Sequence, residues 1–309
     1  MRLFEPLFAI GENIRGIQQA RVAMSRIFSI LDLEPEEALN AAGEKPSFQK
    51  SISFNKVSFS YKEGEPVLDA VSFTVEKGQT VALVGASGSG KTTAVSLLCR
   101  FYPYAEGEIL VDGRPLNALD LKAWRRMIGL VLQDIYLFPG TILENVRVYD
   151  DEVSELDVFG ALKTVHAADF VRRLPNELRT ELHERGANLS MGEKQLLSFA
   201  RAVAFDADIV IMDEATASVD VATERKIQES MGELLKGRTA IIVAHRLSSI
   251  LKADKILFFK DGRIVAQGRH EELLSSLPDY EELVRLQFPD LENTGRDADE
   301  RLVALETLA

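Results

Sequence analysis

The sequence is poor in cysteine and has no long apolar run. Cys99 is the one cysteine in 309 residues, so no intrachain disulfide can form and a reducing compartment is expected. No stretch approaches the roughly 18–20 consecutive apolar residues of a membrane-spanning helix. Glu5 and Glu12 interrupt the first residues, and no small-residue cleavage site follows, so a signal peptide is not predicted. We therefore expect a chain that is soluble by itself, with any membrane crossing made by another segment or chain.

Basic residues are also few relative to acidic ones. The chain has 36 Lys and Arg against 48 Asp and Glu, a formal net charge of −12. Nonspecific binding to nucleic acid or to an anionic membrane favours a basic face, so this balance disfavours both partners. Hydrophobic residues make up 46% and charged residues 27%, as expected for a folded chain long enough to bury a sizeable core.

Residues 1–33 predict one amphipathic helix. Its apolar positions alternate in spacings of four and three, with Arg21 interrupting them: Leu3, Leu7, Ile10, Ile14, Ile17, Met24, Phe28 and Leu31. The helix either docks on its own domain or packs against partner helices, and the heptad-like spacing favours the second interpretation. Residues 34–50 contain Pro35, Gly43 and Pro46 among polar residues and predict a linker.

Residues 51–288 show the pattern of an α/β domain. Alternating apolar residues between Ile52 and Val75 predict a small antiparallel β subdomain. Further strands are expected, with helical segments between them, at Thr80–Val84, Glu108–Val111, Ile128–Leu132, Ile209–Met212, Ala240–Val243 and Lys255–Lys260. Several are continuous apolar runs, which is typical of parallel strands buried on both faces. Residues 140–200 predict an inserted helical subdomain, and residues 289–309 an acidic tail of weak order.

A phosphate-binding loop follows the first of these apolar strands. Residues 85–92, GASGSGKT, fit G-x-x-x-x-G-K-[ST] between a strand and a helix. Small residues let backbone N–H groups surround phosphate oxygens, Lys91 supplies charge to the β- and γ-phosphates, and the Thr92 hydroxyl can ligate Mg²⁺. A glycine-rich turn that only joins strand to helix would not need Lys91. The predicted nucleotide contacts are Gly85, Ala86, Ser87, Gly88, Ser89, Gly90, Lys91, Thr92 and Thr93.

A pair of carboxylates ends a second apolar strand. Asp213 and Glu214 follow Ile209–Met212, and the carboxyl end of a parallel strand faces the ligand crevice of the sheet. There Asp213 can hold Mg²⁺ through water, and Glu214 can orient or deprotonate the attacking water. Together, the two motifs and the pattern of strands and helices predict a P-loop NTPase core with a parallel sheet, an N-terminal antiparallel β subdomain and an inserted helical subdomain.

With these residues located, the sequence resembles an ATP-binding cassette (ABC) domain of the exporter type. The motif that carries the resemblance is LSMGEKQ at residues 189–195, which is similar to the family signature LSGGQ and precedes the Asp213 strand. The resemblance covers residues 50–285. More weakly, residues 1–35 resemble the cytoplasmic end of the last transmembrane helix of an exporter half.

The resemblance implies roles for further residues. Tyr61 matches the aromatic that stacks on adenine, and Gln133 the Q-loop glutamine that reaches Mg²⁺ and the attacking water. Ser190 and Gly192 match the signature positions that contact ATP bound by a partner cassette. Asp220 matches the D-loop, His245 the switch histidine, and Glu184–Gly186 the exporter loop that touches the membrane domain. Taken singly, these residues have ordinary alternatives, such as a strand aromatic, a buried histidine or solvated loop residues, and their shared order argues against coincidence.

The signature departs from the family pattern at two positions. Met191 stands where the family has glycine, and Glu193 where it has glutamine. One interpretation is that both weaken the ATP site that this signature completes. The other is local, since Ser190 and Glu193 also form the S-x-x-E pattern of a helix capping box. Homodimer and heterodimer both stay open.

The resemblance implies an exporter ATPase with ATP and Mg²⁺ as cofactors, catalytic residues Glu214, His245 and Lys91, and metal contacts from Thr92, Gln133 and Asp213. The implied partners are a second cassette and a transmembrane domain, at the cytoplasmic face of the cell membrane, with no nucleic acid. The alternative function is a soluble ABC ATPase in translation or DNA repair, which the single uninterrupted cassette disfavours. A nonhydrolysing module would be expected to lack Glu214 or His245. We expect a piece of a longer transporter rather than a separate ATPase subunit.

Overall fold

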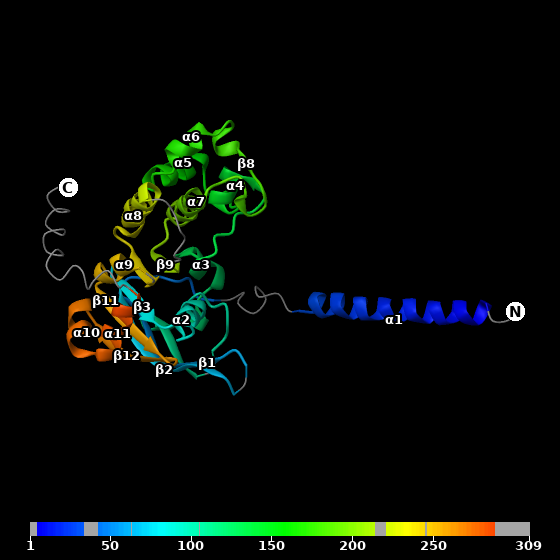
Figure 1. The fold of residues 1–309 in the computed structure, drawn as a ribbon, viewed down its shortest axis with the longest axis horizontal. Coiled ribbons are helices and arrows are strands. Elements are labelled where there is room, and N and C mark those ends of the chain that lie inside the picture. The colour runs from blue at the N-terminus through cyan, green and yellow to red at the C-terminus, as the bar shows by residue number, and fades with distance from the viewer. Residues whose placement is uncertain are drawn as a thin grey trace. The chain divides into compact units, whose positions relative to one another are not determined.

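The structure is a computed structural model that describes residues 5–33, 43–62, 64–104, 106–213, 221–244 and 246–287. The chain divides into two units, residues 1–43 and residues 44–309. The first unit contains helix α1, Glu5–Leu31 (Figure 1). Residues 14–33 are all exposed, including the apolar side chains of Ile17, Phe28 and Leu31. Within the described part of its own unit, the apolar stripe of α1 therefore has no partner.

The second unit begins with an antiparallel sheet of β1 (Ser51–Ser60), β2 (Pro66–Glu76), β4 (Glu106–Val111) and β5 (Arg114–Pro115), in the order β2-β1-β4-β5. Alternate residues of β1 are buried, and the ring of Phe54 stacks on that of Phe73 with centroids 4.3 Å apart. The expectation that residues 108–111 belong to the parallel core is wrong, because β4 pairs antiparallel with β1. Ile109 and Val111 are buried between exposed or half-buried neighbours, an alternation that suits a sheet covered on one face.

The larger sheet has the order β12-β11-β3-β10-β9-β6 in the described residues. Neighbouring strands pair in parallel except β12, which is antiparallel to β11. The bounds are β3 Thr80–Gly85, β6 Ile128–Val131, β9 Ile209–Asp213, β10 Thr239–Val243, β11 Lys255–Lys260 and β12 Arg263–Gly268. The helices between and after them are α2 Lys91–Leu98, η1 Leu116–Ala118, α3 Leu121–Arg126, α8 Val221–Leu235, α9 Leu247–Leu251, α10 His270–Ser276 and α11 Pro278–Gln287. The predicted α/β fold class is confirmed.

The strands of this sheet bury both faces, and each face belongs to a different hydrophobic core. In β9, Ile209 and Ile211 enter the core shared with the antiparallel sheet and α2. Val210 and Met212, which point the other way, enter the core shared with the helices that follow. Successive strand residues point to opposite faces, so the continuous apolar run in the sequence supplies both cores at once.

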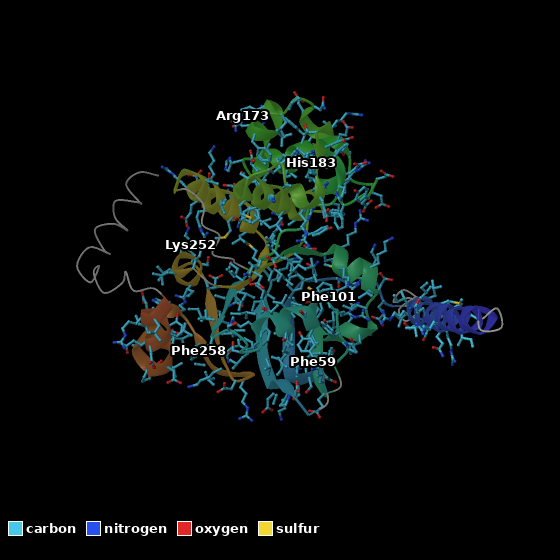
Figure 2. The ribbon with its side chains drawn as sticks, turned by 45° about the vertical axis from the view of Figure 1, so that its right-hand side comes forward. Phe59, Phe101, Arg173, His183, Lys252 and Phe258 are labelled. Atoms are coloured by element: carbon cyan, nitrogen blue, oxygen red, sulfur yellow. The ribbon has the colours of Figure 1, made fainter. Side chains whose placement is uncertain are left out.

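A group of helices is inserted between β6 and β9, where helices were expected. It contains α4 (Ile142–Arg147), α5 (Glu155–Thr164), α6 (Ala168–Arg173) and α7 (Met191–Ala204), and the short turns η2 (Glu177–Arg179) and η3 (Glu184–Gly186). Figure 1 shows these helices together, and Figure 2 marks Arg173 and His183 on them. A two-stranded sheet of β7 (Gly140–Thr141) and β8 (Glu181–Leu182), which the sequence did not predict, lies within the same group. Capping boxes begin α4, α5 and α7.

Asp112 joins the linker end of the second unit to the antiparallel sheet. Its carboxylate accepts hydrogen bonds from the backbone N–H groups of Gln49, Lys50 and Ser51 at 2.6, 2.7 and 3.0 Å. Desolvation raises the pKa of Asp112, but the three backbone hydrogen bonds and the charge of Lys50 outweigh it, and the pKa is lowered overall.

We predict that Asp112→Asn lowers the free energy of unfolding at pH 7 by about 1–2 kcal/mol, because a charged acceptor is replaced by a neutral amide. Since the folded pKa is depressed, the wild type loses this advantage as the pH falls below the ordinary aspartate value of about 3.9 and through the folded pKa. Denaturant unfolding between pH 2.5 and 7 measures the difference. Asp151→Asn, at a carboxylate 89% exposed in a surface ion pair, is the control and should change little. A difference that does not vary with pH would contradict the assignment to charge.

Candidate functional site

The phosphate-binding loop lies where β3 ends and α2 begins. In the larger sheet, β10 lies between β3 and β9, and Val243 of β10 pairs with both Leu83 and Asp213. The carboxyl ends of β3 and β9 therefore meet at one edge of the sheet, which is where parallel sheets bind ligands. Gly90 is the N-cap of α2, with a left-handed φ of 103°, and Lys91 is its first helical residue.

Lys91 is buried inside the loop rather than extended into solvent. Its side chain is 5% exposed, and its Nζ donates to the carbonyl oxygens of Gly85 and Ala86, each at 2.8 Å. Burial lowers the pKa of the Lys91 ammonium, and the nearby charge of Asp213 opposes that change. The loop thus places a cation beside the Asp213 carboxylate at the start of a helix, where an anion is favoured.

Two glycines of the loop approach other backbone closely. A Cβ atom on Gly85 would lie 2.2 Å from the carbonyl oxygen of Phe259, and one on Gly90 would lie 3.0 Å from that of Val67. Gly88 differs, since its φ is also positive, at 79°, but no atom lies within 4 Å of a built Cβ. The motif therefore contains glycines with two distinct roles, close packing at positions 85 and 90 and backbone conformation alone at position 88.

An aromatic cluster lies beside the loop. The Tyr61 hydroxyl is 3.2 Å from Oγ1 of Thr93, and its ring makes edge contacts with Phe59 and Tyr102 at centroid distances of 4.9 and 5.0 Å. Figure 2 marks Phe59 together with Phe101 in this part of the second unit. Tyr61 is 49% exposed and Tyr102 44% exposed, so rings next to the phosphate loop are accessible to a planar ligand.

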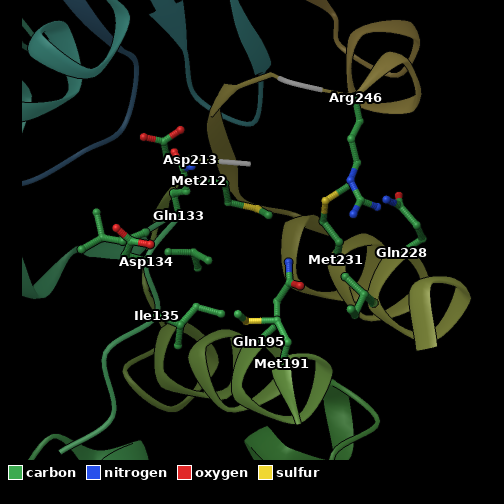
Figure 3. A pocket seen from close by; sticks show the side chains of 13 residues that line it. Gln133, Asp134, Ile135, Met191, Gln195, Met212, Asp213, Gln228, Met231 and Arg246 are labelled. Carbon is green, nitrogen blue, oxygen red and sulfur yellow. The ribbon is translucent and has the colours of Figure 1, made fainter. Parts of the chain in front are cut away.

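A cavity of about 150 Å³ brings together three segments that are distant in sequence. Gln133 and Ile135 line it from the segment after β6, Met191 from the start of α7, and Met212 and Asp213 from the end of β9 (Figure 3). Figure 3 shows the Met191 and Ile135 side chains directed toward one another. The predicted Q-loop glutamine and the predicted metal ligand Asp213 therefore lie next to the beginning of the signature helix of the same chain.

The signature forms the N-terminus of α7. Ser190 is its N-cap: the Ser190 Oγ donates to Oε2 of Glu193 at 2.8 Å and accepts from the Glu193 backbone N–H at 3.3 Å. The Ser190 backbone N–H also donates to this carboxylate, at 2.9 Å, so the predicted capping box is confirmed. Gly192 is buried against Thr223, whose Cγ2 would lie 2.2 Å from an added Cβ. Ser190 and Met191 are exposed.

Not every predicted site residue can be placed. Gly85 to Thr93, Tyr61, Gln133 and Asp213 gather around the carboxyl edge of the sheet, while Ser190 and Gly192 start α7. Glu214, Asp220 and His245 lie outside the described residues. The sequence reading missed Asn145 and Arg201, which link α7 to the segment after Gln133. The available signals were an asparagine in a predicted helix, where it is disfavoured, and an arginine within the apolar run LLSFARAVA.

A strand, loop and helix arranged in this way around a buried lysine define the P-loop class of nucleotide-binding proteins, and the second unit is of that class. Residues 68–217 match the family model described as ABC transporter. The chain belongs to the ABC transporter family, whose ATP-binding domains bind nucleotide and hydrolyse ATP to power transport.

Proteins that this chain resembles include transporters. The chain is 43% identical over 289 residues to a probable multidrug resistance ABC transporter ATP-binding/permease protein of Bacillus subtilis, covering 93% of this chain and 42% of that protein. It is 40% identical to an ATP-dependent lipid A-core flippase of Syntrophus aciditrophicus, covering 93% and 48%. A solved bacterial Atm1-family ABC exporter with ATP bound matches with a TM-score of 0.78 and 38% identity, covering 93% of this chain and 50% of the other. The chain thus spans about half the length of the relatives it matches.

These relatives agree with the exporter type and not with a translation or DNA-repair ATPase. Among the described residues, no helix is both long and apolar enough to cross a membrane.

We predict that Gly90→Ala lowers the free energy of unfolding by about 3 kcal/mol, because it combines a left-handed φ with contacts on Leu68 and Val67. Gly88→Ala, which has the conformational cost alone, should lower it by about 1–2 kcal/mol. Denaturant unfolding of the two variants measures the difference between them. Equal losses would contradict the close packing of Gly90.

Proposed function

We propose that this chain is the ATP-hydrolysing cassette of an ABC exporter and acts as one half of a nucleotide-dependent cassette dimer. The observation that carries the proposal is the buried Lys91 ammonium, held by loop carbonyls beside Asp213 at the start of α2. A bound triphosphate offers this cation stronger, charged acceptors than the carbonyl oxygens. In this proposal Tyr61 stacks on the base, and the backbone from Gly85 to Thr93 binds the phosphates.

Mg²⁺ is proposed to arrive with the nucleotide. Thr92 is exposed in the first turn of α2, and Asp213 ends β9 at the same edge of the sheet. In the described part of the chain, no group of three His, Cys, Asp or Glu side chains forms a metal site. The Thr92 hydroxyl and the Asp213 carboxylate fit Mg²⁺, which keeps several waters and binds one or two protein ligands together with substrate phosphates. Thr92, Asp213 and Gln133 would hold the ion, which would neutralise charge that develops on the phosphates.

Hydrolysis is proposed to depend on positioning and electrostatics. Glu214, which follows Asp213 in the sequence, orients or deprotonates the attacking water. His245 stabilises the γ-phosphate, and Lys91 holds the β- and γ-phosphates while charge develops. Gln133 lies on the exposed segment after β6, from which it can approach both the metal and the water.

The proposed dimer places the signature of one cassette on the ATP of the other. Ser190 is exposed at the N-terminus of α7, whose first N–H groups and positive dipole end favour an anion. Gly192 and Asp220 would complete the contact across the dimer. ATP is then an interface component, and dimer stability is linked to ATP occupancy. The partner is either a second copy of this chain or an unlike cassette.

We further propose that the cassette binds a transmembrane domain at the cytoplasmic face of the membrane. A groove of about 690 Å³ lies between α3 and the helical group, lined by Arg125, Arg126, Tyr149 and Phe205 among others. Tyr149 is 53% exposed, and Phe138 beside it is 42% exposed. Exposed aromatic and arginine side chains of this kind are enriched in protein interfaces. The Glu184–Gly186 turn packs against Leu137 nearby and would add to this surface.

We predict that Lys91→Ala weakens ATP binding at least about tenfold, because a charge-assisted phosphate contact is lost. Glu214→Gln should keep ATP affinity and lose turnover by about a hundredfold or more. Turnover is measured by phosphate release, and binding by calorimetry. Equal turnover of Glu214→Gln and wild type would overturn the role of Glu214.

The same Glu214→Gln chain tests the dimer directly. Since hydrolysis is blocked, Mg-ATP should shift its sedimentation mass from monomer to dimer. Lys91→Ala is the control and should stay monomeric. A monomer that persists with ATP bound would point to an unlike partner cassette or to a dimer that depends on the membrane domain.

The two signature departures give a further prediction. The Glu193 carboxylate lies one hydrogen bond from the Ser190 hydroxyl that would meet the partner's γ-phosphate. Glu193→Gln with Met191→Gly should therefore raise ATP turnover by a few-fold, since removing about 1 kcal/mol of repulsion is worth about fivefold. The matched control is Asp157→Asn, which changes the equivalent capping box of α5, where Ser154 Oγ donates to Asp157. Unchanged turnover would remove the inhibitory interpretation and leave the capping role.

A further inference from the structure

Arg201, in the last turn of α7, reaches across to the chain that follows Gln133. Its NH1 donates to the carbonyl oxygen of Tyr136 at 2.7 Å. Its Nε and NH2 donate to the backbone oxygen and to Oδ1 of Asn145 in α4, at 2.9 and 3.0 Å. The planar guanidinium thus contacts two segments at once, which a lysine ammonium cannot do in the same geometry.

Asn145 extends the contact to the rest of the segment. It is fully buried, and its Oδ1 accepts from the Phe138 backbone N–H at 2.9 Å as well as from Arg201. Its Nδ2 donates to the backbone oxygens of Phe138 and Thr141, at 2.9 and 3.0 Å. All four hydrogen-bonding positions of the amide are therefore used, and three of them hold residues 138–141.

Packing alone does not explain these two residues. Asparagine is disfavoured within a helix, and Asn145 lies inside the six-residue helix α4. Burial lowers the pKa of Arg201 to about 10, so the side chain stays charged at neutral pH while its hydrogen-bond acceptors named above are neutral. We therefore assign the Arg201 cation and the Asn145 amide a structural task, which is to fix the position of the backbone groups to which they are hydrogen-bonded.

The hydrogen bonds of Arg201 and Asn145 connect the signature helix α7 to the segment that follows Gln133. Tyr136 is three residues after Gln133, and Arg201 is on the same helix as the signature. Ser190 and Arg201 are eleven residues apart, about 16 Å along a helix that rises 1.5 Å per residue. At the other end of α7, Met191 and Gln133 line one cavity, so the helix touches the Q-loop region near both of its ends.

We propose that Arg201 and Asn145 join α7 and residues 136–141 into one rigid body, so that a nucleotide-induced shift of Gln133 is transmitted to Ser190 of the same chain. The inference rests on the proposed function, which supplies the nucleotide. Arg201 and Asn145 are positioning residues, since the structure gives them contacts with backbone and with each other and none with the phosphate loop.

Hydrogen–deuterium exchange tests this connection without requiring hydrolysis. The wild type, Arg201→Met and Arg238→Met are compared with and without a nonhydrolysable Mg-ATP analogue, at a concentration where sedimentation shows a monomer. Arg238 is the matched control, because it also donates three hydrogen bonds, to Ala207, Leu234 and Asp206, and none to residues 136–145.

In the wild type and in Arg238→Met, nucleotide should change exchange in residues 85–93, in residues 133–141 and in residues 189–194. In Arg201→Met the first two changes should remain and the third should be lost. Without nucleotide, the amide of Phe138 should exchange about tenfold faster in Arg201→Met than in the wild type. Transmission to residues 189–194 in Arg201→Met, or its absence in the wild type, would overturn the proposal.

A failure of the proposed function gives a different result, because no change would then occur in residues 85–93 of the wild type. Arg201→Lys is the second variant if Arg201→Met does not fold. This variant keeps the charge and the aliphatic stem but loses the planar guanidinium. It should therefore fold, and nucleotide should change exchange in residues 189–194 less than in the wild type. Where turnover is measurable, Arg201→Lys should lower kcat about tenfold with KM changed less than about twofold, since misplacement acts on the chemical step. Wild-type transmission and kcat in Arg201→Lys would also contradict the proposal.

Discussion

Burial of β3, β10 and β9 on both faces is the constraint on which the rest of the structure depends. Because these strands are parallel and in register, β3 and β9 end at the same edge of the sheet. That register places the phosphate loop beside Asp213, although the two are more than 120 residues apart in the chain. The two cores on either side of the sheet hold this edge in place, since consecutive residues of each strand belong to different cores.

The phosphate loop is held in place by contacts within the chain. Lys91 is held by the carbonyl oxygens of Gly85 and Ala86, and two of the glycines leave space that other backbone fills. A cation fixed in this way is the main feature of a preorganised electrostatic site. The helix that begins at Lys91 adds its positive end to the same position.

The signature helix serves a local and a longer-range purpose. Locally, Glu193 completes the capping box that begins α7, and this explains a carboxylate in the signature without reference to catalysis. At longer range, Arg201 and Met191 bring the two ends of α7 to the segment around Gln133. The helical group therefore approaches the carboxyl edge of the sheet through the segment that contains Gln133.

The sequence by itself determined the fold class, the phosphate loop, the Asp213 strand and the capping box at Ser190, because each depends on a local pattern of fixed spacing. It did not determine that residues 106–111 pair antiparallel with β1 instead of joining the parallel sheet. Strand pairing depends on which face of the strand the rest of the chain covers. Nor did it indicate that Asn145 and Arg201 meet. Those residues are 56 positions apart, and only the packing of α4 against α7 brings a buried amide within reach of a guanidinium.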